Sequence, residues 1–124
     1  MAPIAIGELI DKITILEIKE ERILDPDKRR NVTTELQILR EIKSLAGLDT
    51  AEMKLFSREL KSLNTTIWDI EDTIRELEAQ HDFGPRFVEL ARSIYLTNDR
   101  RAHVKNAINR AFVSEIIEEK SYKG

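Results

Sequence analysis

The sequence predicts an all-α fold: an antiparallel helical bundle formed by a single domain over residues 1–124. Apolar residues recur at alternating spacings of three and four along the middle of the chain, which is the period of one face of an α-helix. The three prolines and four glycines stand at places that suit helix ends rather than strands. A chain of 124 residues can bury one hydrophobic core, so we expect one domain.

Two short helices are expected first. Apolar residues on one stripe predict a helix from about Gly7 to Ile23, although its many isoleucines also favour a strand. Asp25 is expected to cap the next helix, with Pro26 at its first position. This helix should run to about Ala46 and end at Gly47. Its expected core face consists of Val32, Leu36, Leu39, Ile42 and Leu45.

The third segment has the clearest helical pattern. Asp49 followed by Glu52 resembles a capping box, which predicts a helix from Thr50 to Gln80. At ~1.5 Å per residue this helix would be about 45 Å long. A turn from His81 to Gly84 should end it. Its a/d repeat consists of Met53, Phe56, Leu60, Leu63, Ile67, Ile70, Ile74 and Leu77.

The fourth segment, which begins at Pro85, should form a long helix and pack on the third as an antiparallel hairpin. Thr97 and Asn98 allow an interruption of this helix, and the tail from Ser114 to Gly124 fits either a loose helix or an extended strap. Its expected core face includes Phe87, Leu90, Ala91, Ile94, Ile108 and Phe112. The first helix is apolar around more than half its circumference, so we expect a homo-oligomer through this helix and the hairpin.

Composition restricts the classes of partner. The net charge of −3 gives no long-range attraction to nucleic acid or to an anionic membrane, so neither is expected to bind. The absence of cysteine excludes disulfides, thiolate metal sites and cysteine nucleophiles. We expect a cytoplasmic protein, because the N-terminus lacks the features of a signal peptide and no run approaches the ~18 apolar residues of a membrane span.

Three polar residues interrupt the core face of the last helix. Between Ile94 and Ile108, the positions on this face are occupied by Asn98, Arg101 and Lys105. A buried cation without a partner is very costly, so Arg101 and Lys105 must pair with carboxylates, face solvent or hold an anion. Two interpretations stay open: an internal ion-pair network, or a site for a small phosphorylated or carboxylated ligand. The candidate carboxylate partners are Glu20, Glu71 and Glu78.

Arginine side chains near this break suit the recognition of phosphate or carboxylate. The candidate ligand-binding residues are Asn98, Asp99, Arg100, Arg101, Lys105, Glu71, Asp72 and Arg75. The alternative function is a small metal-dependent or acid/base enzyme that acts on a phosphorylated nucleotide or sugar and uses Glu71, Asp72 and Glu78. The EExxE pattern of helical nucleotide pyrophosphatases is incomplete, because Arg75 stands where an acid is needed. We expect no metal and no cofactor.

Other polar and aromatic residues favour structural roles. Glu8 and Asp11 have a spacing that is common on exposed helix surfaces. His81 and His103 lack the spacing of metal ligands. Trp68 is expected to anchor the packing of the hairpin. The sequence contains no glycine-rich phosphate loop and no arrangement of Ser, His and Asp that indicates nucleophilic catalysis.

Four stretches carry a resemblance to a known family. They are GELIDKITILEIKEERI, NTTIWDIEDTIRELE, ARSIYLTNDRRAHVKNAIN and EEKSY, in this order over nearly the whole chain. Together they resemble a family of short bacterial and phage proteins known only as a domain of unknown function. The resemblance implies no activity, substrate or cofactor, but it places the candidate polar residues within the shared motifs.

Overall fold

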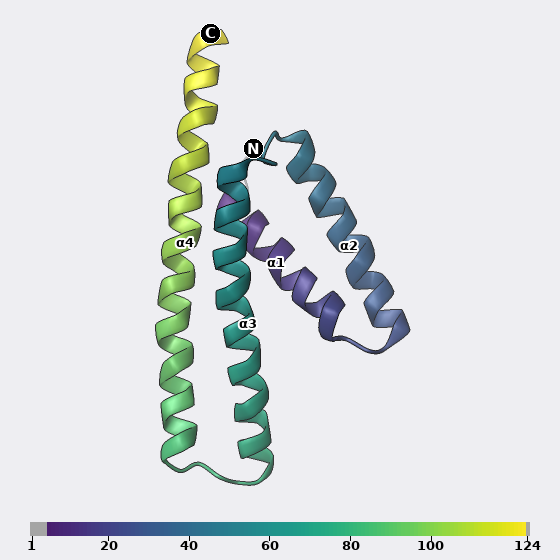
Figure 1. Cartoon of the computed structure of the whole chain (residues 1–124), viewed down its shortest axis with the longest axis vertical. Helices are drawn as coiled ribbons and strands as arrows, with labels where there is room; N and C mark the ends of the chain where they lie inside the picture. The colour runs from purple at the N-terminus through teal and green to yellow at the C-terminus, as the bar shows by residue number, and fades with distance from the viewer. Residues whose placement is uncertain (1–4, 124) are drawn as a thin grey trace.

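The computed structural model describes the backbone of residues 5–123 and the side-chain surroundings of residues 5–112. This part of the chain forms four helices and no strand: α1 (Ile6–Arg22), α2 (Pro26–Leu45), α3 (Ala51–Ala79) and α4 (Pro85–Lys123). α3 and α4 lie side by side as an antiparallel hairpin, with α1 and α2 beside the N-terminal part of α3 (Figure 1). The predicted all-α fold is confirmed. None of the described helices has the length and apolar character that a membrane span requires.

α1 is the most enclosed helix of the fold, because α2, α3 and α4 all pack on it. Ile10, Ile13, Leu16 and Ile18 point in different directions around α1, and all four are buried. The chain's own helices therefore cover the apolar circumference that suggested a homo-oligomer. Burial within the chain removes this reason for self-association through α1, and a homo-oligomer through the hairpin stays a prediction.

The hydrophobic core lies where α1 crosses the hairpin. Leu36 of α2, Leu60 of α3 and Ile108 of α4 are completely buried there. The predicted apolar face of α3 is present, and its most buried members, Met53 and Leu60, lie in the N-terminal half, while Leu77 is buried near the other end. Ile70 and Ile74 near the hairpin end are only half-buried. The reason is that α1 and α2 do not reach this end, so α4 alone covers it (Figure 1).

The expected core face of α2 is wrong at its C-terminal end. Leu36 faces α1, but Ile42 is 48% exposed and Leu45 is 82% exposed. Within the described residues α2 packs on α1 alone. Ile42 and Leu45 lie with the exposed Ile38 on the outer face of α2, whereas Leu36 and Leu39 lie on the face that meets the core.

The ends of α2 follow the predicted capping chemistry. The Asp25 carboxylate accepts a hydrogen bond from the backbone N–H of Asp27 at 3.0 Å, and Pro26 is the first helical residue. Gly47 follows the end of the helix with φ of 72°, a backbone conformation that glycine adopts without steric cost. Single residues in the sequence therefore predict both ends of α2.

The predicted cap of α3 is displaced by one residue. Thr50, not Asp49, is the N-cap, and its hydroxyl oxygen accepts a hydrogen bond from the Met53 N–H at 3.0 Å. The Asp49 carboxylate instead pairs with the Lys43 ammonium at 3.2 Å. Asp49 thereby connects the end of α2 to the loop, and Thr50 is left to begin α3.

α4 is continuous through the polar positions where an interruption was allowed. The Thr97 hydroxyl donates to the Ser93 carbonyl at 2.7 Å, and the Asn98 side chain accepts from Arg101 at 3.3 Å. Both polar side chains are therefore satisfied one turn away without breaking the helix. The backbone of the C-terminal tail is helical to Lys123, and the side chains of residues 113–124 lie outside the described part.

Candidate functional site

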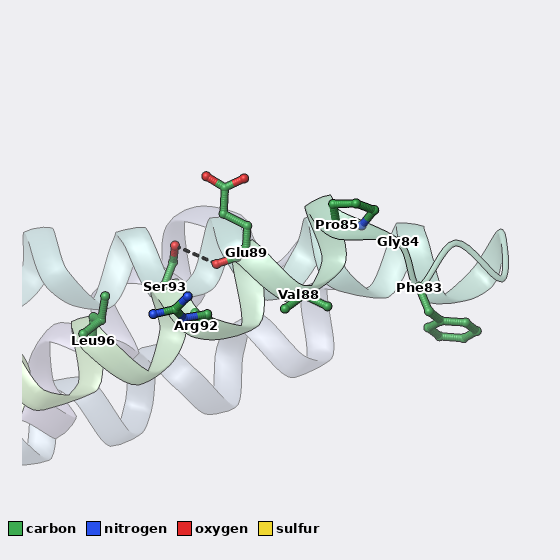
Figure 2. A pocket seen from close by; sticks show the side chains of 8 residues that line it. All are labelled: Phe83, Gly84, Pro85, Val88, Glu89, Arg92, Ser93 and Leu96. Atoms are coloured by element: carbon green, nitrogen blue, oxygen red, sulfur yellow. Dashed lines mark hydrogen bonds between the residues drawn. The ribbon is translucent and has the colours of Figure 1, made fainter.

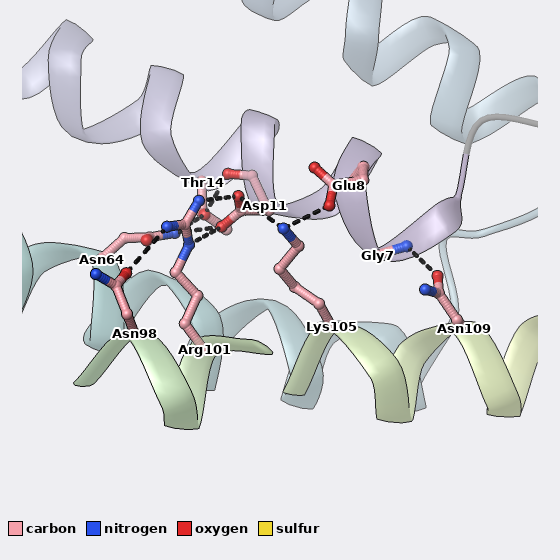
Figure 3. A network of polar contacts seen from close by, with 9 residues as sticks. All are labelled: Gly7, Glu8, Asp11, Thr14, Asn64, Asn98, Arg101, Lys105 and Asn109. Atoms are coloured by element: carbon pink, nitrogen blue, oxygen red, sulfur yellow. Dashed lines mark hydrogen bonds and ion pairs between the residues drawn. The ribbon is translucent and has the colours of Figure 1, made fainter. Parts of the chain in front are cut away.

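The polar positions of α4 meet one carboxylate of α1, that of Asp11 (Figure 3). The Arg101 guanidinium donates from Nε to Asp11 Oδ1 at 2.9 Å and from Nη2 to Asp11 Oδ2. The Lys105 ammonium lies 3.8 Å from Asp11 Oδ2 and also pairs with the exposed Glu8. Asp11 is only 3% exposed. Its carboxylate therefore occupies the position that an external anion would take between the two cations.

A buried amide of α3 completes the shell around this carboxylate. Asn64 Nδ2 donates to Asp11 Oδ1 and to Thr14 Oγ1, both at 2.9 Å. The Thr14 hydroxyl in turn donates to the Asp11 backbone carbonyl at 2.7 Å. Among the described residues, every buried side-chain nitrogen and oxygen has a hydrogen-bond partner. The contacts therefore join α1, α3 and α4 into one closed polar network.

The same line of contacts contains a very close approach of α1 to α4. The Gly7 N–H donates to Asn109 Oδ1 at 2.7 Å, so a side chain of α4 caps the first turn of α1. A Cβ atom at Gly7 would lie 2.5 Å from the Lys105 carbonyl oxygen. Only glycine fits here. The Asp11 network, as we call this set, consists of Gly7, Glu8, Asp11, Thr14, Asn64, Asn98, Arg101, Lys105 and Asn109.

The network keeps its central pair ionised. Burial raises the pKa of Asp11, but hydrogen bonds from Arg101 and Asn64 and the charges of Arg101 and Lys105 outweigh it. The pKa of Asp11 therefore lies below its ordinary value. The hydrogen bond to Asp11 raises the pKa of Arg101, although burial opposes the change. Both groups are charged at neutral pH.

The partners of the two cations differ from those expected. Arg101 and Lys105 pair with Asp11 and Glu8 of α1, and the Glu20 carboxylate accepts a hydrogen bond from Thr33 instead. The interpretation of Asp11 as an exposed residue is wrong. A signal was present in the sequence, because Asp11 is seven residues before the apolar Ile18 and so lies on the same face of α1. Asn64 and Thr14 were not identified from the sequence.

Arg101 also borders a cavity of about 450 Å³ between α1 and α3. It makes three hydrogen bonds with the five N–H donors of a guanidinium, so two donors remain. Glu71 and Arg75, both candidates from the sequence, line the same cavity with the half-buried Trp68. The Trp68 pocket, as we call it, is lined by Ile15, Ile18, Lys19, Asn64, Ile67, Trp68, Glu71, Arg75 and Arg101.

The remaining candidates lie elsewhere on the surface. Asp99 and Arg100 are exposed on α4, and Arg100 borders a separate hollow beside His103. Asp72 is exposed on α3, 3.6 Å from the Arg75 guanidinium. Of the three carboxylates in the enzyme alternative, only Glu71 lines the Trp68 pocket. In the described part of the chain no three Asp, Glu or His side chains come together as metal ligands.

Comparison with known families agrees with the sequence motifs. A family of unknown function, DUF6165, matches residues 2–124. This chain belongs to DUF6165. Comparison with curated proteins and with solved structures finds no match. Every residue of the Asp11 network falls within the first three motifs quoted above, so this DUF6165 chain builds its network from those segments.

Proposed function

We propose that this chain is a helical binding module that holds a small phosphorylated or carboxylated ligand in the Trp68 pocket. The observation that carries the proposal is unused cationic hydrogen-bonding capacity around one cavity. Arg101 keeps two free donors, and Lys19 has no ion-pair partner among the described residues. Arg75 has only the exposed Asp72, at 3.6 Å. An anion in this pocket would meet all three cations.

The lining of the pocket favours a ligand with a ring as well as an anionic group. The lining contains three cations and one carboxylate, that of Glu71. Asp11 offsets the charge of Arg101 and Asp72 lies near Arg75, so Lys19 is the cation that has no ion-pair partner among the described residues. Trp68 and Ile15 supply apolar surface for a sugar or base, and the Glu71 carboxylate can accept hydrogen bonds from ligand hydroxyl or amino groups. A sugar phosphate or a nucleotide fits this combination better than bare phosphate.

In this proposal the Asp11 network forms the rigid base of the pocket. Asp11 holds the Arg101 guanidinium by two hydrogen bonds and is not itself part of the pocket lining. A cation that is already held in place loses little conformational entropy when a ligand binds. We place the module in the cytoplasm, and its lack of cysteine is compatible with a reducing compartment.

Fluorescence offers a direct test, because Trp68 is the only tryptophan of the chain. We expect titration with glucose 6-phosphate, uridine monophosphate or citrate to change Trp68 emission and to raise the melting temperature. A ligand at 100 times its Kd should add about 2.7 kcal/mol of stability. Lys19→Met and Arg75→Met should weaken binding, whereas Arg58→Met, at an exposed position on α3, should not. The proposal is wrong if no compound acts at millimolar concentration, or if Arg75→Met binds as well as Arg58→Met.

A further inference from the structure

The hairpin end exposes apolar surface on the outer side of α4. Phe83 is 54% exposed, Val88 53% and Leu96 57%. Figure 2 shows Val88 and Leu96 on α4 and Phe83 in the turn before it, with no other helix of the chain in front of them. They border an open groove of about 730 Å³. The hairpin-end face, as we call it, consists of Phe83, Gly84, Pro85, Val88, Glu89, Arg92, Ser93 and Leu96.

We propose that a second copy of this chain covers the hairpin-end face in a two-fold dimer in which the two α4 helices are antiparallel. In such an interface every contact occurs twice. If residue i of one copy touches residue j of the other, residue j of the first copy also touches residue i of the second. The residues of the face on α4 pair up in this way about a point between residues 90 and 91. Pro85 and Leu96 are equally far from that point, and so are Glu89 and Arg92. Pro85 would meet Leu96 and each Glu89 would meet an Arg92. The remaining pair on α4 joins Val88 to Ser93.

The charges at the centre decide the direction of the two helices. Neither Glu89 nor Arg92 has an ion-pair partner in the described part of the chain. An antiparallel dimer brings Glu89 of each copy to Arg92 of the other and forms two equivalent ion pairs. A parallel dimer would place like charges against each other, which is unfavourable. Spacings of four, three and four separate Pro85, Glu89, Arg92 and Leu96. This is the a/d pattern along which two helices pack.

A second exposed apolar stripe on α2 lacks this charge symmetry. It consists of Ile38, Ile42 and Leu45. The basic residues near this stripe are already used within the chain, because Arg40 pairs with Glu17 and Lys43 pairs with Asp49. The α2 stripe offers apolar contact without a pair of free opposite charges, so the hairpin-end face is the better surface for self-association.

Charge exchange between copies tests both the dimer and its direction. Sedimentation of the full chain should show a concentration-dependent dimer, and Glu89→Arg and Arg92→Glu should each raise the dimer Kd by at least about tenfold. An equimolar mixture of these two variants should regain the dimer, because every contact between unlike chains then joins opposite charges. The double variant E89R/R92E should also dimerise. Circular dichroism checks that each variant is folded.

Matched controls make the outcome decisive. Glu76→Arg introduces the same charge change at an exposed position on α3 and should leave the dimer unchanged. The proposal is overturned if the chain is monomeric at all concentrations, or if E89R dimerises as well as Glu76→Arg. It is also overturned if the mixed variants stay monomeric, or if Ile42→Asp on α2 dissociates the dimer while E89R does not.

Discussion

At the scale of single residues, the main finding is that the Asp11 carboxylate lies between Arg101 and Lys105, where the sequence left either an ion-pair network or a ligand open. Asp11 accepts hydrogen bonds from Arg101 and Asn64 and is almost completely buried. A buried ion pair is not stabilising merely because it exists, since both charges lose hydration. Removing one partner, however, leaves the other charge poorly solvated. The Asp11 network should therefore be sensitive to single substitutions.

Asp11→Asn preserves the shape of the side chain and removes its charge. We expect it to destabilise the fold by about 3 kcal/mol, because Arg101 and Lys105 lose their shared counter-charge. Asp72→Asn removes the carboxylate of an exposed pair and should cost less than ~0.5 kcal/mol. Urea unfolding of both variants measures the difference. Equal stability of the two variants would contradict the role assigned to Asp11.

The lowered pKa of Asp11 predicts the direction of a pH effect. The unfolded chain binds a proton at this group more readily than the folded chain, so its contribution to stability rises with pH. That contribution should be complete above the pKa of about 3.9 for an unfolded Asp. It should disappear as the pH falls through the lower folded value. The stability difference between wild type and Asp11→Asn should therefore shrink below about pH 4. A difference that grows on acidification would show that the sign is wrong.

At the scale of helices, a glycine sets how closely α1 approaches α4. Gly7 donates its N–H to Asn109, and its Cα lies against the backbone at Lys105. Glycine normally lowers helix stability by about 1 kcal/mol relative to alanine. Its presence in the first turn of a well-packed helix is explained by the lack of space for a side chain.

Gly7→Ala therefore distinguishes helix propensity from packing by the sign of its effect. If α1 had room, alanine would stabilise the protein by up to about 1 kcal/mol. We expect destabilisation by about 1 to 3 kcal/mol instead, because the added Cβ would meet the Lys105 carbonyl and force α1 away from α4. Thermal or urea unfolding gives the sign directly. A stabilised variant would show that the close approach does not exist in solution.

At the scale of the whole molecule, the α1–α2 pair and the α3–α4 hairpin enclose a core near one end. At the other end, α3 and α4 contact only each other. The core residues Met53, Leu60 and Phe112 are buried around α1, whereas Ile74 and Phe87 at the hairpin end are half-buried. Local stability follows the density of buried contacts. The molecule should therefore open first at the end of the long hairpin.

Hydrogen exchange can detect this order of opening. Backbone amides of α3 from residue 74 to 79 and of α4 from residue 89 to 95 should exchange faster than those of α1 from residue 10 to 18. The expected reason is that only α3 and α4 cover each other there, while three helices cover α1. Exchange measured by NMR or mass spectrometry gives the protection of each segment. Equal protection at both ends would contradict a core confined to the α1 crossing.

The site was only partly predictable, and its residues show why. Arg101 and Lys105 could be identified because they interrupt a periodic apolar face within one helix. Their partners could not, since Asp11 and Asn64 lie 90 and 53 residues apart from the groups they bind. Glu71, one of three candidate carboxylate partners from the sequence, lines the neighbouring pocket instead of pairing with either cation. Periodicity orients side chains around one helix but does not give the point at which two helices cross.

The sequence by itself determined the four helices, the continuous apolar face of α3 and most helix ends, because periodicity, proline, glycine and capping residues act within a few positions. Only the tertiary structure decided that Asp11 neutralises Arg101, that α1 is covered within its own chain and that the outer face of α4 is left open. These features depend on how helices from distant parts of the chain cross, and that arrangement is set by the packing of the whole core.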